Sequence, residues 1–176
     1  MKQEYEYYLV DKCHPLPAEY VPGDLVVAPI PFAAPINDPK CLICSIVYFP
    51  LKSLYYASRD AGLCLYGISA YRSYYRQAEI YQESIKNRGI NHTRKYIAVP
   101  GTSEHQTGLA IDLSCPANDF LLTESFADTA EGKWLADNVH KFGFALSYPK
   151  DKVKVTGYNY EPWHIRFTCK YAKFYV

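Results

Sequence analysis

The sequence predicts a single domain over residues 1–176 of the α+β class, in which helices flank a small, mainly antiparallel sheet. Two observations predict this class. Apolar residues recur at helical spacing in segments that end at a glycine, and short strand-like segments lie between them. Long turns separate these segments, as is typical of α+β domains. A chain of this length can bury a core without disulfides or a structural metal.

The first forty residues are expected to be an extended lead-in that belongs to the domain. Seven prolines fall between residues 13 and 40, and proline removes a backbone donor and fixes φ. We therefore expect this part of the chain to be irregular and to wrap around the rest.

Three helices and four strands are expected after the lead-in. Each helix carries a start or stop signal: serine is a common N-cap, and glycine commonly ends a helix. The helices are residues 51–58 before Gly62, the segment between the Ser73 cap and Gly89, and residues 134–142 before Gly143. The strands are residues 63–69, 109–114, 144–147 and 164–168.

Charge and hydropathy exclude several classes of protein. Nineteen basic and eighteen acidic residues give a net charge of +1, which disfavours nucleic-acid binding and attachment to anionic lipid. No apolar run reaches the roughly 18–20 residues that a membrane-spanning helix needs. The N-terminus carries no apolar signal segment, so we expect a cytoplasmic protein, unless a leader or anchor has been removed from an extracytoplasmic one.

Six cysteines also favour a reducing cytoplasm. The pair Cys41 and Cys44 has the spacing of a zinc or redox motif, but no second pair and no nearby histidine completes a zinc site. We expect free, partly buried thiols.

Two segments bring together residues that can bind a metal. His105 and Asp112 lie in SEHQTGLAID, and His164 lies in YEPWHIR. Two imidazoles and one carboxylate form a ligand set of catalytic zinc, with the fourth position left for water. Glu161, three residues before His164, is the candidate base for that water. On the residues alone, ordinary polar side chains on strands remain the alternative.

The spacing differs from that of the common HExxH helix. His105 and Asp112 are seven residues apart, so on one regular strand they would point to opposite faces. Gly108 between them allows a sharp turn that could bring both to one ion. Pro162 keeps the segment before His164 from being regular sheet.

Both segments resemble motifs of one family. SEHQTGLAID matches SxHxxGxAxD and is followed, in the right order, by EPWH; ISAYRSYYRQ and WLADNVHKFGF extend the similarity over roughly residues 7–168. The chain resembles the VanY-type D-alanyl-D-alanine carboxypeptidases, zinc peptidases that share a fold with lysostaphin-type enzymes and the hedgehog signalling domain.

The resemblance implies a role for eight residues. One zinc ion per chain would be bound by His105, Asp112 and His164, and Glu161 would be the general base. Arg72 would stabilise the oxyanion, because a guanidinium stays charged and donates several hydrogen bonds. Gln77 and Ser103 would hold the C-terminal end of the substrate, and Trp163 would wall the site. The alternatives are a solvated helix residue for Gln77, a loop or cap residue for Ser103 and a core anchor for Trp163.

The resemblance also implies an activity. The expected enzyme hydrolyses D-Ala-D-Ala termini of peptidoglycan stem peptides, or the free dipeptide, and some members of the family confer vancomycin resistance in this way. An L,D-carboxypeptidase or an endolysin-like endopeptidase is the alternative among peptidases. A non-catalytic, hedgehog-like binding domain is a third reading, which the intact ligand set and Glu161 disfavour.

Overall fold

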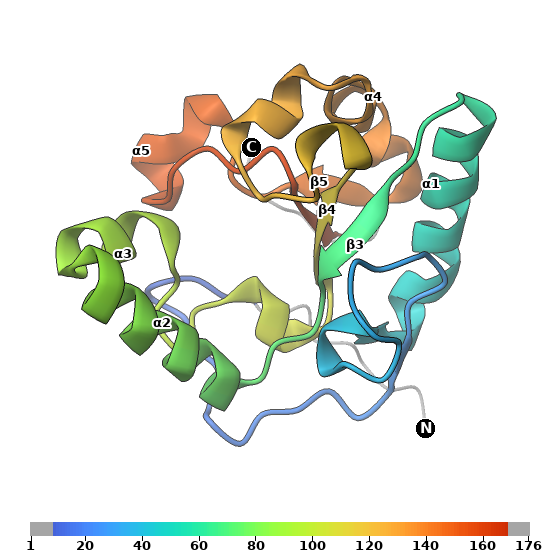
Figure 1. The fold of residues 1–176 in the computed structure, drawn as a ribbon. Coiled ribbons are helices and arrows are strands. Elements are labelled where there is room, and N and C mark those ends of the chain that lie inside the picture. The colour runs from blue at the N-terminus through green and yellow to red at the C-terminus, as the bar shows by residue number, and fades with distance from the viewer. Residues whose placement is uncertain (1–8, 169–176) are drawn as a thin grey trace.

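A four-stranded antiparallel sheet lies at the centre of the computed structural model, which describes residues 9–168 (Figure 1). Its strand order is β3–β4–β6–β5, from β3 (Tyr66–Ser69), β4 (Ala110–Ser114), β5 (Phe144–Leu146) and β6 (His164–Phe167). The expected α+β class with a small antiparallel sheet is confirmed. The first strand is shorter than expected: the preceding helix ends in a turn at residues 61–62, Leu63 N–H still donates to Ser58 O, and residues 63–65 lead into β3 without being part of it.

A second, two-stranded sheet was not expected. β1 (Leu25–Val27) pairs antiparallel with β2 (Leu42–Cys44). The lead-in is otherwise irregular, as predicted, but the expectation was wrong for residues 25–27. No proline lies between Pro22 and Pro29, so the backbone donors there are free to pair once β2 lies alongside.

The lead-in lies directly against the part of the chain that carries the first candidate metal ligand. Leu16 N–H donates to Gly101 O at 2.8 Å, and the Gln106 side-chain amide donates to Pro17 O at 2.9 Å. Gln106 is the neighbour of His105, so the proline-rich segment supports the turn from which this histidine projects.

Within residues 9–168, five helices surround the central sheet, with α1 on one side and α2 and α3 on the other (Figure 1). Their bounds are α1 Tyr48–Asp60, α2 Tyr74–Arg88, α3 Ile90–Tyr96, α4 Ala130–Asn138 and α5 Val153–Thr156. The Ser73 side chain caps α2 by accepting from Arg76 N–H, and Gly89 ends that helix with a φ of +79°. The serine therefore begins this helix and the glycine ends it, as expected.

The remaining helices depart from the sequence-based expectation. α3 starts directly after Gly89, so the glycine ends one helix without ending helical structure, and α5 was missed because it has a single turn. The predicted helix at 134–142 begins earlier, at the Thr129 cap, and its last turn tightens into a 3₁₀ helix (Val139–Phe142) before Gly143. The other 3₁₀ turns are Pro39–Cys41, Ser45–Val47, Glu104–Thr107, Pro116–Asn118, Glu124–Asp128 and Lys150–Lys152.

Strand β4 joins the hydrophobic core to the candidate site. All five of its residues are buried, and Ile111 and Leu113 belong to the core cluster that α1 and α4 complete with Leu51 and Leu135. Side chains alternate along a strand, so Asp112 points to the opposite face of the sheet. Within the described residues, no helix has the length and apolar character needed to cross a membrane.

Candidate active site

Three separate elements bring the candidate metal ligands together. His105 lies in the 3₁₀ turn Glu104–Thr107, which ends at Gly108 with a φ of +68°. Asp112 lies on β4, and His164 begins β6 directly opposite Asp112 in the antiparallel register. The turn at Gly108 is thus present where the spacing required it.

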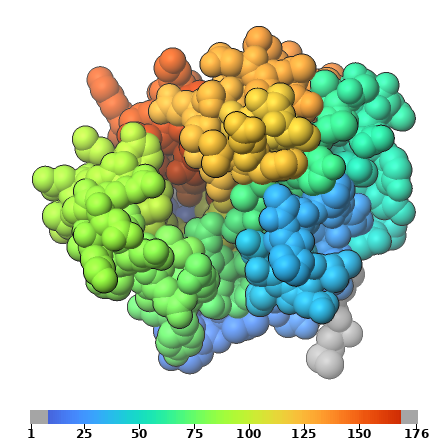
Figure 2. Space-filling model, in the orientation of Figure 1, coloured from blue at the N-terminus to red at the C-terminus, as the bar shows by residue number. Residues whose placement is uncertain are grey.

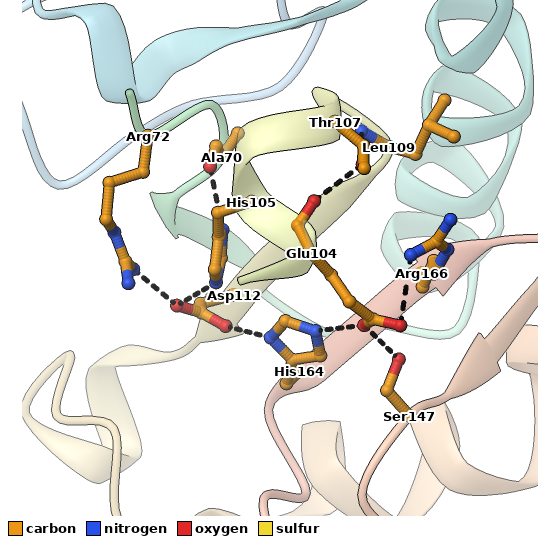
Figure 3. A network of polar contacts seen from close by, with 10 residues as sticks. All are labelled: Ala70, Arg72, Glu104, His105, Thr107, Leu109, Asp112, Ser147, His164 and Arg166. Carbon is orange, nitrogen blue, oxygen red and sulfur yellow. Dashed lines mark hydrogen bonds and ion pairs between the residues drawn. The ribbon is translucent and has the colours of Figure 1, made fainter. Parts of the chain in front are cut away.

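The three side chains form a compact, buried cluster. Their ligand atoms all lie within 4.8 Å of one another. His105 Nε2 lies 3.2 Å from Asp112 Oδ2, and His164 Nδ1 lies 2.9 Å from Asp112 Oδ1 (Figure 3). Each side chain is at most 5% exposed. Two imidazole nitrogens and a carboxylate oxygen, converging at this range, fit the ligand set of a catalytic zinc ion.

Each histidine is held by a hydrogen bond on its outer nitrogen. His105 Nδ1 donates to Ala70 O at 2.7 Å, which leaves the Nε2 lone pair facing Asp112. His164 Nε2 donates to Glu104 Oε2 at 2.8 Å, which leaves Nδ1 as the nitrogen facing Asp112. Outer partners of this kind orient metal-binding histidines.

The cluster carries a strong separation of charge. Burial opposes the charge on His164, but the hydrogen bonds and negative charges of Asp112 and Glu104 outweigh it and raise the pKa of His164 to about 10. Burial also opposes the charge on Asp112, yet the two histidines keep the pKa of Asp112 below its ordinary value. Burial lowers the pKa of His105, and the nearby Arg72 adds to this.

Glu161 lies at the same cluster and has the protonation behaviour that a general base requires. Its side chain lines the same cleft as the three ligands. Burial raises the pKa of Glu161 to about 7, although the positive charge of His164 opposes the shift. A carboxylate with a pKa near neutrality can accept and return a proton at working pH.

Arg72 lies beside Asp112, next to the carboxylate oxygen that also contacts His105. Its Nη2 lies 3.6 Å from Asp112 Oδ2 and donates to Ser69 Oγ at 3.1 Å, while its Nη1 donates to Gln77 Oε1 at 2.9 Å. Gln77 is 1% exposed, and its amide nitrogen donates to Ala98 O at 2.7 Å. Gln77 is therefore not the solvated helix residue of the alternative interpretation, and its side chain fixes the guanidinium.

All eight residues singled out in the sequence line one cleft of about 660 Å³. Ser103 and Trp163 are buried, at 4% and 8% exposure, so each has protein neighbours as well as a face on the cleft. Figure 2 shows the hollow between the green α2–α3 side and the gold and red segments opposite. The contacts of Ser103 and Trp163 with a substrate stay predictions.

Two residues at the cluster were missed in the sequence. Glu104 binds His164, and its only signal was its place beside His105 in the first motif. Tyr148 packs its ring against that of His164 at a centroid distance of 4.9 Å and lines the cleft. Tyr148 follows β5, and only the register of β5 on β6 brings it to the site.

Of the cysteines that the structure describes, none belongs to the candidate metal cluster. Among residues 9–168, the group His105, Asp112 and His164 is the one that could hold a metal ion. The five described cysteines are free thiols, as expected, and burial raises the pKa of Cys44 to about 12, so this thiol stays protonated. Cys169 lies outside the described residues.

A buried His–Asp–His cluster, with a base of neutral pKa and a fixed arginine at the foot of a cleft, defines the site of a metallopeptidase. Comparison with known proteins agrees. The model of the VanY family, described as D-alanyl-D-alanine carboxypeptidase, matches residues 43–170. The chain belongs to this family of peptidases.

Two curated relatives cover nearly the whole chain. YodJ of Bacillus subtilis (strain 168), which is named only provisionally as a carboxypeptidase, is 42% identical over 164 residues, covering 93% of this chain and 60% of YodJ. The bifunctional D-Ala-D-Ala dipeptidase and carboxypeptidase VanXYC of Enterococcus gallinarum is 34% identical over 90% of this chain and 81% of its own length. The chain thus spans about three-fifths of the first relative.

Solved structures share the fold, and the three described here each align with 90% of this chain. The LdcB LD-carboxypeptidase has a TM-score of 0.85 and 42% identity over 74% of its chain. VanYB in complex with D-alanine-D-alanine has a TM-score of 0.72 and 31% identity over 84% of its chain. A point mutant of the vancomycin resistance D,D-pentapeptidase VanY, in complex with Zn(II), has a TM-score of 0.71 and 31% identity over 85% of its chain.

Proposed function

We propose that this protein is a zinc-dependent carboxypeptidase that removes the C-terminal D-alanine of peptidoglycan stem peptides by hydrolysing the D-Ala-D-Ala bond. The observation that carries this proposal is the buried cluster of His105, Asp112 and His164 at the cleft that Glu161 and Arg72 also line. The VanY structure with Zn(II) supports zinc as the ion, and the VanYB complex supports the dipeptide terminus.

Each side chain of the site has a defined task in this reaction. A zinc ion held by the three ligands would supply Lewis-acid polarisation and a water of lowered pKa. Glu161 accepts the proton of the attacking water and returns it to the leaving amine, the task of a carboxylate in general acid–base catalysis. Glu161 is 9% exposed, so most of its side chain is enclosed by protein.

Arg72 stabilises the negative charge that develops on the carbonyl oxygen. Its two outer nitrogens are already fixed by Ser69 and Gln77, so the guanidinium does not have to reorganise when the charge appears. Such fixed donors stabilise a transition state more than mobile ones do.

The length of the cleft favours a peptide over the free dipeptide. One face of α2 lines the cleft from Gln77 past Ile80 and Ser84 to Arg88. At the rise of an α-helix this face spans about 16 Å. An extended peptide advances about 3.3 Å per residue, so the cleft has room for roughly five residues. A dipeptide would fill less than half of it.

Hydrolysis of an L,D bond is the second candidate. The LdcB LD-carboxypeptidase has a higher TM-score and a higher identity to this chain than VanYB has. The same catalytic groups serve either bond, because the difference lies in the residue on the amino side of the scissile bond.

One experiment separates these candidates. Zinc-loaded protein is incubated with D-Ala-D-Ala, a stem pentapeptide that ends in D-Ala-D-Ala and a tetrapeptide that ends in L-Lys-D-Ala, and release of D-alanine is followed by mass spectrometry. We expect the pentapeptide to be the best substrate. Preference for the tetrapeptide would establish the L,D alternative, and no release from any peptide would refute the carboxypeptidase proposal.

A matched pair of substrates separates exopeptidase from endopeptidase activity. Amidation of the C-terminus removes a charge for which a carboxypeptidase provides donors, and a lost charged hydrogen bond costs roughly 1.5–3 kcal/mol. We expect the pentapeptide amide to be cleaved at least ~10-fold less efficiently than the acid. Equal cleavage of acid and amide would favour the endopeptidase alternative.

A further inference from the structure

Glu104 precedes the candidate ligand His105 in sequence, but its carboxylate points to the other ligand histidine (Figure 3). Glu104 Oε2 accepts from His164 Nε2 at 2.8 Å. The backbone of Glu104 begins the 3₁₀ turn, and Thr107 Oγ1 donates to its carbonyl oxygen. The turn that carries one ligand therefore also supplies the partner of the second.

Two further donors fix the Glu104 carboxylate. Ser147 Oγ donates to Oε2 at 2.6 Å, and Arg166 Nη1 donates to Oε1 at 3.1 Å. Arg166 and His164 are two residues apart on β6, so they project from the same face of the sheet. The Glu104 side chain is 13% exposed. One of the two donors, Ser147, directly follows β5, and the other, Arg166, lies on β6, which pairs with β5.

The position of one proton on His164 decides whether this side chain can bind a metal. A neutral imidazole carries a single N–H, and here a carboxylate lies at each ring nitrogen: Asp112 at Nδ1 and Glu104 at Nε2. If the proton sits on Nδ1, it points into the cluster and blocks coordination. If it sits on Nε2, the Nδ1 lone pair is available. His105 meets the same requirement, because Ala70 O accepts from its Nδ1 and the Nε2 lone pair is left for the ion.

We propose that Glu104 is a positioning residue for the metal: it holds the remaining proton of His164 on Nε2, so that Nδ1 keeps its lone pair for the ion. The carboxylate also fixes the ring plane, since rotation of the ring would turn C–H groups toward both carboxylates. This inference rests on the metal-binding part of the proposed function and is independent of the peptide that is cleaved.

The test measures the affinity for zinc alone, by competition with a chromophoric chelator, in wild type, Glu104→Ala and Glu104→Gln. Loss of an outer partner of a metal-binding histidine typically costs about 10–100-fold in metal affinity. We expect this loss in both variants. In Glu104→Gln one carboxylate oxygen becomes an NH₂ donor. This NH₂ group either faces Arg166 Nη1, donor to donor, or donates to His164 Nε2 and so favours the wrong tautomer.

Glu79→Gln is the matched control. It makes the same change at a carboxylate that pairs with Arg76 at the surface, outside the metal cluster, so zinc affinity should stay at the wild-type value. Circular dichroism of the metal-free variants checks that each is folded. The d–d absorption of the cobalt-substituted protein should change in the Glu104 variants and not in the control.

A measurement on the wild type needs no variant to fold. In zinc-loaded protein with ¹⁵N-labelled histidine, NMR should find His164 protonated at Nε2 and metal-bound at Nδ1. Metal bound at Nε2, or a folded Glu104→Gln variant with wild-type zinc affinity and cobalt spectrum, would overturn the inference. Wild type that binds no zinc would refute the metal site itself, whereas normal zinc binding without peptide hydrolysis would refute only the assigned activity.

Discussion

Arg72 and Gln77 are joined by a hydrogen bond of 2.9 Å from Nη1 to Oε1, across the first turn of α2. The amide of Gln77 is itself held, since its nitrogen donates to Ala98 O. Both polar ends of this side chain are therefore used by the protein. The sequence motif suggests that Gln77 contacts the substrate, whereas the structure gives it a second task, the orientation of Arg72.

Replacement of Gln77 by alanine tests this task. We expect Gln77→Ala to lower kcat by about 10-fold with little change in KM, because the guanidinium acts on charge that develops after binding. The loss should be smaller than that of Arg72→Ala, for which removal of an oxyanion donor predicts ~10²–10³-fold. Steady-state kinetics on the pentapeptide measures both.

Arg76→Ala is the control on the same helix. Arg76 pairs with Glu79 at the surface, with its side chain 59% exposed, so its loss should leave kcat within about twofold. Unchanged kcat in a folded Gln77→Ala variant would show that Ser69 alone suffices to position Arg72.

Substitution of Glu161 by glutamine should separate chemistry from metal binding. We expect Glu161→Gln to retain one zinc ion per chain and to lose ~10²–10⁴-fold in kcat, the usual contribution of a general base. Elemental analysis and single-turnover kinetics measure the two quantities. Near-normal turnover with normal zinc content would assign the proton transfer to another group, and Tyr148 would be the next to examine because it lines the same cleft.

The parts of the site that the sequence predicts are those encoded locally. His105, Gly108 and Asp112 lie within one short motif, so their spacing already specifies a turn followed by a strand. The role of Glu104 could not be predicted in this way. It depends on the antiparallel register that places Ser147 and Arg166 beside the same carboxylate, and register is a tertiary property.

The same distinction applies to the fold. The cap at Ser73 and the stop at Gly89 are local signals, and both ends of α2 follow them. β1 has three residues and no strong alternation, and it forms because β2 lies beside it. α3 was missed because a glycine with positive φ ends one helix and, in this fold, also directly precedes the next.

Gly108 should be the most sensitive of the turn glycines at the site. Its φ of +68° costs an L-residue about 1–2 kcal/mol. A Cβ there would also meet Cys44 Sγ at 2.9 Å and Leu25 Cδ2 at 3.0 Å. Because overpacking typically adds about 1–3 kcal/mol, we expect Gly108→Ala to lower the free energy of unfolding by roughly 2–5 kcal/mol.

Gly62→Ala provides the matched comparison. Gly62 has a similar φ of +78°, but no atom lies within 4 Å of its Cβ position. Urea unfolding of both metal-free variants therefore isolates the packing contribution. Equal losses would show that β1 and β2 move aside at no cost, and zinc affinity should fall only in Gly108→Ala, because this turn aims His105.

Zinc binding should release at least one proton per chain near pH 7. One comes from His164, and Glu161, with a pKa of about 7, can add to the count. In the metal-free protein the pKa of His164 is raised to about 10 by Asp112 and Glu104, so both ring nitrogens are protonated at neutral pH. Coordination requires the Nδ1 lone pair, and the proton on Nδ1 must leave, whereas the proton on Nε2 stays with Glu104. Asp112 releases none, because its pKa is held below the ordinary value. Since the displaced group has a raised pKa, the apparent zinc affinity should rise about tenfold per pH unit from pH 7 until the pH approaches the pKa of His164. Calorimetric titration in two buffers of different ionisation enthalpy counts the protons directly. A count near zero would mean that His164 is already neutral in the metal-free protein, and the charge separation described for this cluster would then be wrong.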